Sequence, residues 1–453
     1  MSHTETAGGK LPAPQFPGAR MPPGPRLPRA IQTAGFMFGA PRFLEVCARR
    51  YGGAVTFSTL FDNRFVMLFD PALVKQLMHG SADQLHAGEA NALLGPVVGE
   101  RSVLLLDGAE HLRHRRLLLP SFHGRRLQAY AETMRESADI EIERWPVGQQ
   151  FALLPSMQAL TLRVIMRAVF GYHGGSEEDQ LQGALRAMIE PLSRPRGMML
   201  LAAIGRFGGN RAVAGRFERA RLAVDAILLA EIARRRADPD LADRDDVFSA
   251  LLLARDEDGE HLSDAEIRDE LVTLLLAGHE TTATGLAWTF DLLLHTPSAY
   301  ARAREREPEY LEAVVKEALR IRPVIPGIGR LVSAEPVELG GYTIPPGVEI
   351  NPSIRVIHRR DELYPDAEEF RPERFLGDGA PDTYTWLPFG GGVRRCLGAS
   401  FAQMEMRIVL EQVLSRCALL AARTELDQAE LRAITLVPRD GVLVFQDRPP
   451  RAR

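Results

Sequence analysis

The pattern of apolar and polar positions changes along the chain. In residues 110–321 the apolar residues recur at intervals of three and four, most clearly in residues 162–169 and 222–232, and this spacing predicts amphipathic helices. After Arg322 the pattern changes to proline, glycine and short β-type runs. A further helix is expected at about residues 399–419. The whole pattern predicts a mainly α fold with a small β portion.

Shorter patterns predict the elements outside this helical stretch. A helix is expected at residues 43–51, and a turn at Asp62 and Asn63 separates two short apolar runs. Runs of β-branched and aromatic residues bounded by Gly, Pro, Asp or Asn are typical of strands. The expected strands are residues 54–57, 65–69, 337–339, 342–344, 434–436 and 442–445.

The longest predicted helix has clear signals at both ends. Ser263 with Glu266 three residues later forms a capping box ahead of an apolar run. The helix should continue to about His295, where Thr296 and Pro297 stop it. That is roughly 30 residues, or about 45 Å at 1.5 Å per residue. A helix of this length, apolar over much of its surface, is expected to cross the middle of the fold.

The domain organisation follows from the absence of repeats and internal linkers. Residues 1–28 form a Pro/Gly-rich lead, which we expect to be flexible, and residues 449–453 form a short tail. Residues 29–448 are expected to form one large domain. With 453 residues in the chain, such a domain can enclose a large cofactor, because the buried fraction rises with size.

Charge and cysteine usage exclude several classes of protein. The formal net charge of -4 argues against nucleic acid as a partner. Cys47, Cys396 and Cys417 are an odd number outside any C-x-x-C pattern, which argues against a disulfide framework, a zinc ribbon and c-type haem attachment. The longest apolar runs, such as residues 198–204, are too short for a transmembrane segment, which needs about 20 residues. We therefore expect a cytoplasmic protein.

The segment FGGGVRRCLG at residues 389–398 is the strongest candidate for chemistry. Three glycines let the backbone bend tightly beside a bound group. Neighbouring cations, N–H donors and the positive end of the following helix would stabilise a thiolate at Cys396. Taken alone, such a cysteine is more often a small buried apolar residue than a ligand, and only the surrounding pattern favours the ligand.

A second candidate segment, AGHETT at residues 277–282, lies in the middle of the long helix. Gly and Thr are unfavourable inside a helix, and a threonine hydroxyl can draw a backbone carbonyl out of the hydrogen-bond ladder. Ala277 and Gly278 beside Glu280 and Thr281 would make a notch that carries proton-relay groups. The alternative is a helix with an exposed Glu and an unimportant Gly.

Two further patterns pair charged residues on one helical face. Glu317 and Arg320 are spaced i,i+3 and can form an ion pair, although a surface pair would stabilise the helix by only a few tenths of a kcal/mol. His111 and Arg115 are spaced i,i+4, which suits the binding of carboxylates. The alternative for this second pattern is a basic helix exposed to solvent that binds no ligand.

These segments together resemble the cytochrome P450 family. The pattern F-x-x-G-x-R-x-C-x-G is matched at all of its fixed positions in residues 389–398, and A/G-G-x-D/E-T-T/S is matched in residues 277–282. FRPERF at residues 370–375 resembles the family segment that completes the E-x-x-R network. The resemblance covers about residues 22–447. It implies the cytochrome P450 fold around haem b, with Cys396 as the axial ligand of the iron.

The resemblance also implies roles for individual residues. Thr281 and Glu280 would act in proton delivery to oxygen. A structural network would hold the cysteine loop through Glu317, Arg320 and Arg374. Haem contacts, including the propionate clamp, would come from His111, Arg115, Arg330, Arg394, Phe389, Gly398, Ala277 and Gly278.

The activity implied is that of a monooxygenase, which inserts one oxygen atom from O2 into a hydrophobic small molecule by hydroxylation or epoxidation. Substrate contacts are expected in mostly aliphatic segments, and suit a fatty acid, terpene or steroid. Those segments are residues 87–103, 198–204 and 324–328, with the surroundings of Leu276, Ala277 and Leu436. Arg206, Phe207 and the glycines at 208 and 209 suggest a mobile lid.

Electrons would come from NAD(P)H through a separate ferredoxin or flavodoxin-type donor, because the chain has no recognisable flavin or iron–sulfur motif. Arg113, Arg116 and Arg395 would form a cationic docking face for that donor. Two alternatives remain open at this point. One keeps the haem but performs rearrangement, dehydration or carbon–carbon coupling, and the other is a non-catalytic haem protein that senses a gas or carries a ligand.

Overall fold

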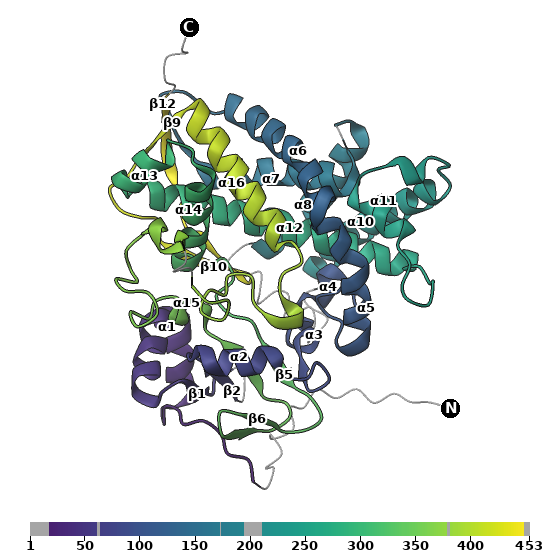
Figure 1. Ribbon diagram of the computed structural model, residues 1–453. Coiled ribbons are helices and arrows are strands. Elements are labelled where there is room, and N and C mark those ends of the chain that lie inside the picture. Colours follow the sequence, from purple (N-terminus) through teal and green to yellow (C-terminus); the bar gives the residue numbers. More distant parts are fainter. Residues whose placement is uncertain (1–17, 61–63, 173, 194–210, 378–380, 448–453) are drawn as a thin grey trace, which may run out of the picture.

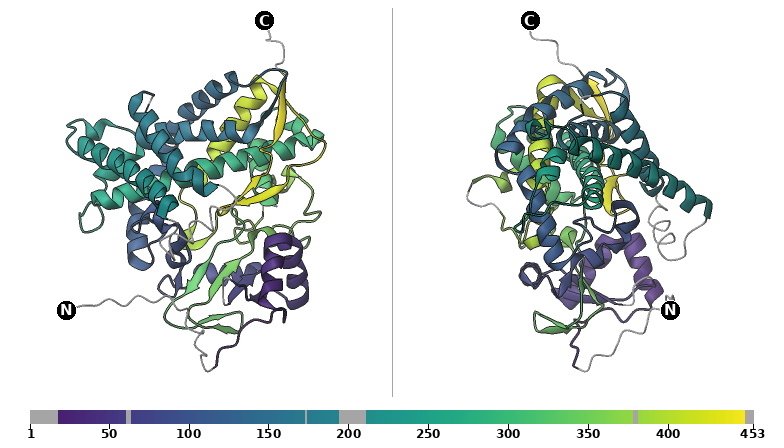
Figure 2. Two further views of the ribbon diagram at one scale, coloured as in Figure 1. Left: turned by 180° about the vertical axis from the view of Figure 1, so that it is seen from behind. Right: turned by 90° about the vertical axis from the view of Figure 1, so that its right-hand side faces the viewer.

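The computed structural model describes residues 18–60, 64–172, 174–193, 211–377 and 381–447. Figure 1 shows a helical body above a smaller part that contains strands β1, β2 and β5 with helices α1 and α2. Both views in Figure 2 keep this smaller part at one end of the helical body. The mainly α fold with a small β portion, predicted from the sequence, is confirmed.

Helices of the main body pack around α12. They are α5 (Gly108–Leu118), α6 (Gly124–Glu143), α7 (Leu153–Phe170), α8 (Ser176–Ser193), α10 (Arg211–Arg236), α11 (Val247–Leu253), α12 (Asp264–Leu294), α13 (Pro297–Ala303), α14 (Pro308–Ile321) and α16 (Ala399–Arg416). The remaining helices are α1 (Arg29–Tyr51), α2 (Pro71–His79), α3 (Ala87–Ala90), α4 (Gly95–Val98) and α15 (Ile354–Ile357).

Helix α12 forms as its sequence predicts. The Ser263 hydroxyl accepts the Glu266 N–H at 3.3 Å, and the Glu266 carboxylate accepts the Ser263 N–H at 2.7 Å. His295 is the C-terminal cap, immediately before the stop at Thr296 and Pro297. The two flanks of α12, residues 267–273 and 282–293, are buried. The helix therefore runs through the core.

The largest sheet has the strand order β1-β2-β8-β5-β3. Its strands are β1 (Ala54–Phe57), β2 (Phe65–Leu68), β8 (Glu349–Pro352), β5 (Arg330–Val332) and β3 (Leu85–His86). Strand β2 pairs with β8 in parallel, which brings residues 65–68 beside a segment almost 300 positions later in the chain. This sheet fixes where Arg330 lies.

Three smaller sheets complete the β portion. One has the order β4-β12-β9, another pairs β10 with β11, and the third pairs β6 with β7. Their strands are β4 (Gln150–Ala152), β12 (Leu443–Asp447), β9 (Ala418–Ala421), β10 (Ala429–Arg432), β11 (Thr435–Pro438), β6 (Val337–Leu339) and β7 (Tyr342–Ile344).

Several elements differ from the sequence expectation, most clearly at the ends of two helices and at one strand. Helix α1 begins at Arg29 rather than near residue 43, because Gly35 and the glycine and proline that follow are tolerated within the helix. Helix α16 ends at Arg416, and the next residues join strand β9, which pairs with β12. The short strand β4 interrupts a stretch expected to be helical because β12 supplies it with a partner.

Helix α7 is long and apolar enough to cross a membrane by length and composition alone, but 67% of it is buried inside the protein. It lies against α12, and its residues Met157, Leu160, Val164 and Ile165 belong to the main hydrophobic core. Core packing accounts for its apolar character.

Candidate active site

The segment at residues 389–398 forms a tight loop immediately before α16. The Cys396 N–H donates to the Phe389 carbonyl oxygen at 2.9 Å and closes the loop. Gly390 and Gly392 have φ values of +67° and +62°, which only glycine adopts readily. A Cβ atom on Gly392 would overlap the Met78 carbonyl oxygen. The glycines are therefore required by backbone geometry and by close contact with α2.

Cys396 lies at the end of this loop with an accessible side chain. Surrounding protein still raises the pKa of its thiol above the ordinary value, because it removes much of the solvation that a thiolate needs. The Gly398 N–H and the charges of Arg395 and Arg115 act in the opposite direction. A bound cation would complete the stabilisation, because a thiol that coordinates a metal ion is deprotonated.

The four basic side chains predicted to bind carboxylates, His111, Arg115, Arg330 and Arg394, come together from separate elements. Burial, Arg394, Arg115 and Arg330 lower the pKa of His111 to about 3, so the imidazole is neutral. Burial and the Arg394 charge also lower the pKa of Arg330 to about 10. Asp107 is the carboxylate that lies near this cluster. The remaining positive charge suits a ligand with two carboxylates.

Arg394 is held in place by the segment before α5. Its guanidinium donates to the Val103 carbonyl oxygen at 3.2 Å, to the Leu106 carbonyl oxygen and to the Asp107 carboxylate. Asp107 also accepts the N–H groups of Gly88 at 2.9 Å and Glu89 at 3.0 Å. The cysteine loop, α3 and α5 are thereby tied together at one carboxylate.

The middle of α12 is accessible, although its flanks are buried. Ala277 is exposed, and Gly278, Glu280 and Thr281 are half-buried. The Thr281 hydroxyl donates to the Ala277 carbonyl oxygen at 2.6 Å, which is the intrahelical bond that a threonine at this position can make. An added Cβ atom on Gly278 would lie 2.6 Å from Ile165 Cδ1. The glycine thus permits close packing of α12 on α7.

Two side chains of α7 bind the same part of α12. Gln158 Nε2 donates to a Glu280 carboxylate oxygen at 2.8 Å, and the Thr161 hydroxyl donates to the His279 carbonyl oxygen at 3.0 Å. Sequence reasoning missed both residues, because no spacing signal links α7 to α12. The acid of the AGHETT segment is therefore held by a neutral amide.

Glu317 and Arg320 are fully buried and form a two-point ion pair, with N–O distances of 2.6 and 2.8 Å. Arg374 Nε donates to Glu317 Oε1 at 3.2 Å, and the Arg371 N–H donates to the same oxygen at 3.0 Å. The chain thus places all three residues of the nominated network in contact. Every oxygen of Glu317 has a donor, as a buried carboxylate requires.

His358 extends this network toward the cysteine loop, and nothing in its local sequence suggested a role. Its Nδ1 lies 3.0 Å from the Arg320 carbonyl oxygen, and Arg320 Nη1 donates to the His358 carbonyl oxygen at 2.6 Å. Trp386 adds a second link, since its Nε1 donates to the Lys316 carbonyl oxygen at 3.1 Å. The segment before the cysteine loop is therefore fixed to α14.

Some of the segments expected to contact substrate lie in the described part of the chain, and others do not. Val97, Val98 and Val103 are buried core residues. The Leu436 N–H donates to the Val324 carbonyl oxygen at 2.8 Å, so two of the nominated segments are neighbours. Residues 198–204, with Arg206, Phe207 and the glycines at 208 and 209, lie outside the described residues.

The expected cationic docking face has less free charge than the sequence suggested. Arg113 Nε donates to Asp256 at 2.6 Å, and Arg113 Nη1 donates to Glu266 at 3.1 Å. Arg116 forms an ion pair with Glu257 at 2.9 Å. Arg395 is exposed. Folding thus places the acidic residues of the 256–266 segment beside two of the three arginines.

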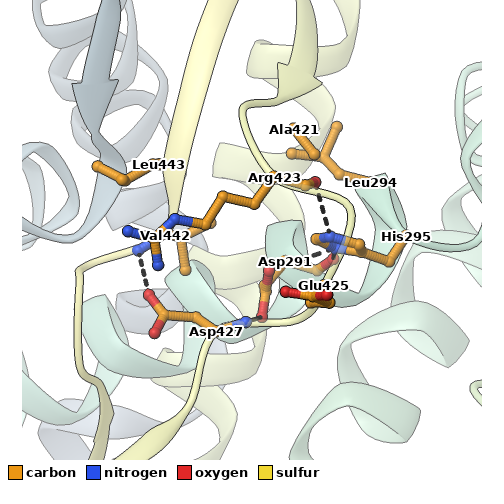
Figure 3. Close-up of a pocket in the computed structure, with 9 residues that line it drawn as sticks. All are labelled: Asp291, Leu294, His295, Ala421, Arg423, Glu425, Asp427, Val442 and Leu443. Atoms are coloured by element: carbon orange, nitrogen blue, oxygen red, sulfur yellow. Dashed lines mark hydrogen bonds and ion pairs between the residues drawn. The ribbon is translucent and has the colours of Figure 1, made fainter.

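Figure 3 shows a small pocket between the C-terminal end of α12 and the strands near the C-terminus. The Asp427 N–H donates to Asp291 at 3.0 Å, and His295 Nε2 lies 3.2 Å from the Arg423 carbonyl oxygen. Its water-accessible volume is about 10 Å³, close to the minimum for one water. None of the residues predicted for catalysis or cofactor binding lines it.

The sequence matches known proteins over most of its length. Residues 22–445 match the family model of cytochrome P450. The chain is 42% identical over 434 residues to cytochrome P450 135B1 of Mycobacterium tuberculosis, covering 94% of this chain and 91% of that protein. It is 40% identical over 441 residues to cytochrome P450 137 of the same organism, covering 95% and 92% of the two chains.

The chain belongs to the cytochrome P450 family. Solved structures agree in fold: cyanobacterial CYP120A1 with retinoic acid bound has a TM-score of 0.78 at 23% identity, covering 95% of this chain and 100% of that one. The haem domain of cytochrome P450DA has a TM-score of 0.79 at 23% identity, covering 95% and 98%. The family is one of haem-thiolate monooxygenases, and this chain is such an enzyme, with haem as its cofactor.

The residues of this site fit haem. A thiol supplied by a glycine-rich loop offers the iron a soft anionic ligand. The cluster of His111, Arg115, Arg330 and Arg394 can receive two propionates. Within the described part of the chain, the Arg115 guanidinium makes no hydrogen bond or ion pair, so it is available for such a ligand.

Proposed function

We propose that Cys396 is the axial ligand of haem b iron in this enzyme. The enzyme inserts one oxygen atom from O2 into a hydrophobic small molecule, by hydroxylation or epoxidation. The observation that carries the proposal is the contrast among the cysteines, all of which are described. Cys47 and Cys417 are buried in apolar cores, whereas Cys396 is accessible at the end of a constrained loop.

In the proposal, His111, Arg115, Arg330 and Arg394 bind the haem propionates. Phe389, Gly398, Ala277 and Gly278 surround the cofactor. Bound haem supplies a redox-active iron whose thiolate ligand favours cleavage of the O–O bond. Neutral His111 donates or accepts a single hydrogen bond at each ring nitrogen, while the guanidinium groups can bind carboxylates at two points.

We assign proton delivery to Glu280 and Thr281. Their place in the accessible middle of α12 supports this assignment, because a proton donor must reach both solvent and the reacting group. Gln158 orients the Glu280 carboxylate through one oxygen and leaves the other free of that contact. The Thr281 hydroxyl can exchange its bond to the Ala277 carbonyl oxygen for one to a bound acceptor.

The contacts of Glu317 and Arg320 on α14, together with His358, support the cysteine loop. Glu317 and Arg320 are fully buried, and the guanidinium groups of Arg320 and Arg374 donate to backbone carbonyl oxygens as well as to Glu317. Their proposed role is to hold the loop so that the Cys396 sulfur keeps its position.

The proposed substrate is apolar, because the nominated segments that line the interior are aliphatic. Ile328 supports this assignment, since its Cδ1 lies within 3.3 Å of the Cβ position of Gly390 in the cysteine loop. Electrons come from NAD(P)H through a ferredoxin or flavodoxin-type donor in the cytoplasm. Exposed Arg395 is the proposed contact that remains for an acidic donor.

The spectrum of the dithionite-reduced, carbon-monoxide-bound protein tests this function. Wild-type protein should give the red-shifted Soret band of thiolate-ligated haem, and Cys396→Ser should lose it. Cys417→Ser is the matched control and should keep the band, because its hydroxyl can replace the Sγ contact with the Val413 carbonyl oxygen. An ordinary haem–carbon monoxide band in folded wild-type protein would exclude Cys396 as the ligand.

A further inference from the structure

We propose that Glu270 is a positioning residue: it fixes the 101–107 segment to α12 and thereby holds Arg394 of the cysteine loop in place. The inference rests on the proposed function, because it assigns a second task to the cation that is proposed to bind a propionate. Glu270 lies two turns before Ala277 on α12 and is fully buried.

A single residue connects Glu270 with Arg394. The Val103 N–H donates to Glu270 Oε1 at 2.8 Å, and the Val103 carbonyl oxygen accepts Arg394 Nη1 at 3.2 Å. Val103 is therefore bound on one side by α12 and on the other by the loop that carries Cys396. A shift of Val103 would move the group that Arg394 binds.

The neighbouring residues repeat this attachment to α12. The Arg101 N–H donates to Asp269 Oδ2 at 2.9 Å. The hydroxyls of Ser102 and Thr273 lie 2.7 Å apart. Three consecutive residues of the segment are thus bound by one face of α12, and Glu270 binds the residue that also contacts Arg394.

His114 on α5 compensates the buried charge of Glu270. Its Nδ1 lies 2.8 Å from Glu270 Oε1, and its Nε2 lies 3.1 Å from Glu266 Oε1. An ionised carboxylate only accepts hydrogen bonds, so two such contacts require a donor at each ring nitrogen. Arg113 and the Ser263 N–H also bind Glu266. The buried carboxylate of Glu270 consequently has a charged partner, as burial requires.

The same arrangement fixes α5, which carries the proposed propionate ligands His111 and Arg115. His114 belongs to this helix, so its bond to Glu270 sets the distance between α5 and α12. Arg394 also donates to Asp107, the residue immediately before α5. One carboxylate on α12 therefore controls two sources of positive charge that are proposed to bind haem.

The test compares two conservative variants of the holoenzyme. Glu270→Gln keeps the reach to the Val103 N–H but loses the charge, whereas Glu270→Asp keeps the charge but is shorter by one methylene. Thr289→Val is the matched control, because Thr289 is buried on the same helix and donates to Gly285 within it. The measurements are hydrogen exchange of residues 101–107 and the rate of haem transfer to an apoglobin acceptor.

We expect Glu270→Asp to raise both rates by about tenfold, which corresponds to the loss of one hydrogen bond to a charged group. Glu270→Gln should stay within about threefold of wild type, and Thr289→Val should change neither rate even if it lowers the Tm. A larger effect of Gln than of Asp, or unchanged rates in both, would overturn the proposal.

The reduced, carbon-monoxide-bound spectrum keeps this outcome separate from the proposed function. If wild-type protein lacks the red-shifted band, the assignment of Cys396 fails whatever the variants do. If every variant shows the band but Glu270→Gln raises the rates more than Glu270→Asp does, only the role of Glu270 fails.

Discussion

The His358 imidazole accepts the Leu387 N–H at Nε2, at a distance of 2.8 Å. Leu387 lies two residues before Phe389, where the cysteine loop begins, and His358 Nδ1 faces the Arg320 carbonyl oxygen at 3.0 Å. The ring is therefore the neutral tautomer with its proton on Nδ1. One buried imidazole thus connects the Glu317–Arg320 pair with the start of the cysteine loop.

Removal of this imidazole should destabilise the protein and its haem site together. His358→Ala leaves the Leu387 N–H and the Arg320 carbonyl oxygen without this partner and opens a cavity, which together cost about 2–4 kcal/mol. Urea unfolding monitored by far-UV circular dichroism measures the loss. His123→Ala, at an exposed position, is the control and should change stability by less than about 0.5 kcal/mol. An equal stability of the two variants would contradict the proposed connection.

Stability should fall as the pH decreases below about 6.5, and His358 should contribute to that fall. Burial lowers the pKa of His358 from 6.5 to about 3. Between these values the unfolded state binds more protons than the folded state, so acidification favours unfolding by up to about 1.4 kcal/mol per pH unit for this group. His358→Gln should show a shallower decline between pH 7 and 5 in urea titrations. Parallel curves for the two proteins would show that His358 does not titrate on unfolding.

The Glu317–Arg320 pair should be far more sensitive than a surface pair of the same spacing. Glu317→Gln leaves Arg320 buried with its charge uncompensated, which costs about 3–5 kcal/mol. Arg135 and Glu132 form an exposed i,i+3 pair at 3.1 Å, and Arg135→Ala should cost less than about 1 kcal/mol. Thermal unfolding and haem content per chain measure both. Full haem incorporation and an unchanged Tm in Glu317→Gln would count against the network as the support of the cysteine loop.

Gly278 should tolerate a methyl group only when the Ile165 side chain is shortened. In Gly278→Ala the new methyl would lie 2.6 Å from Ile165 Cδ1, and overpacking costs about 1–3 kcal/mol, offset in part by the better helix propensity of Ala. Ile165→Val removes the Cδ1 atom and should recover at least half of the loss in the double variant. Additive effects of the two substitutions, measured by a double-mutant cycle, would exclude direct packing between these residues.

Gln158→Leu should impair proton delivery more than haem binding. The substitution removes the 2.8 Å hydrogen bond to Glu280 but keeps the size of the side chain. We expect product formed per NADPH consumed to fall by about three- to tenfold, in line with the loss of one hydrogen bond to a charged group. The carbon-monoxide spectrum should stay that of wild type, as it should in Thr281→Ala, which alters the residue proposed to deliver protons. If the product formed per NADPH consumed is unchanged in Gln158→Leu but falls in Thr281→Ala, Gln158 has a packing role alone.

Local sequence signals predicted the helices with strong periodicity or caps. Ser263 and Glu266 located the start of α12. The boundaries at Arg29 and Arg416 were missed, because β-pairing partners and tertiary packing override local propensity there. The family assignment rested on four motifs taken together and is confirmed, whereas the roles of individual site residues stay predictions.

By itself, the sequence determined which chemical groups are present: a cysteine in a glycine-rich loop, an acid and a threonine within a long helix, and cations spaced to share a face. Spacing along one element is enough for those statements. Only the tertiary structure decided that Gln158 holds Glu280, that His358 reaches Leu387, and that Arg113 and Arg116 are paired with acids. Those contacts join residues on different elements, and the packing of buried surfaces, rather than any local pattern, brings such elements together.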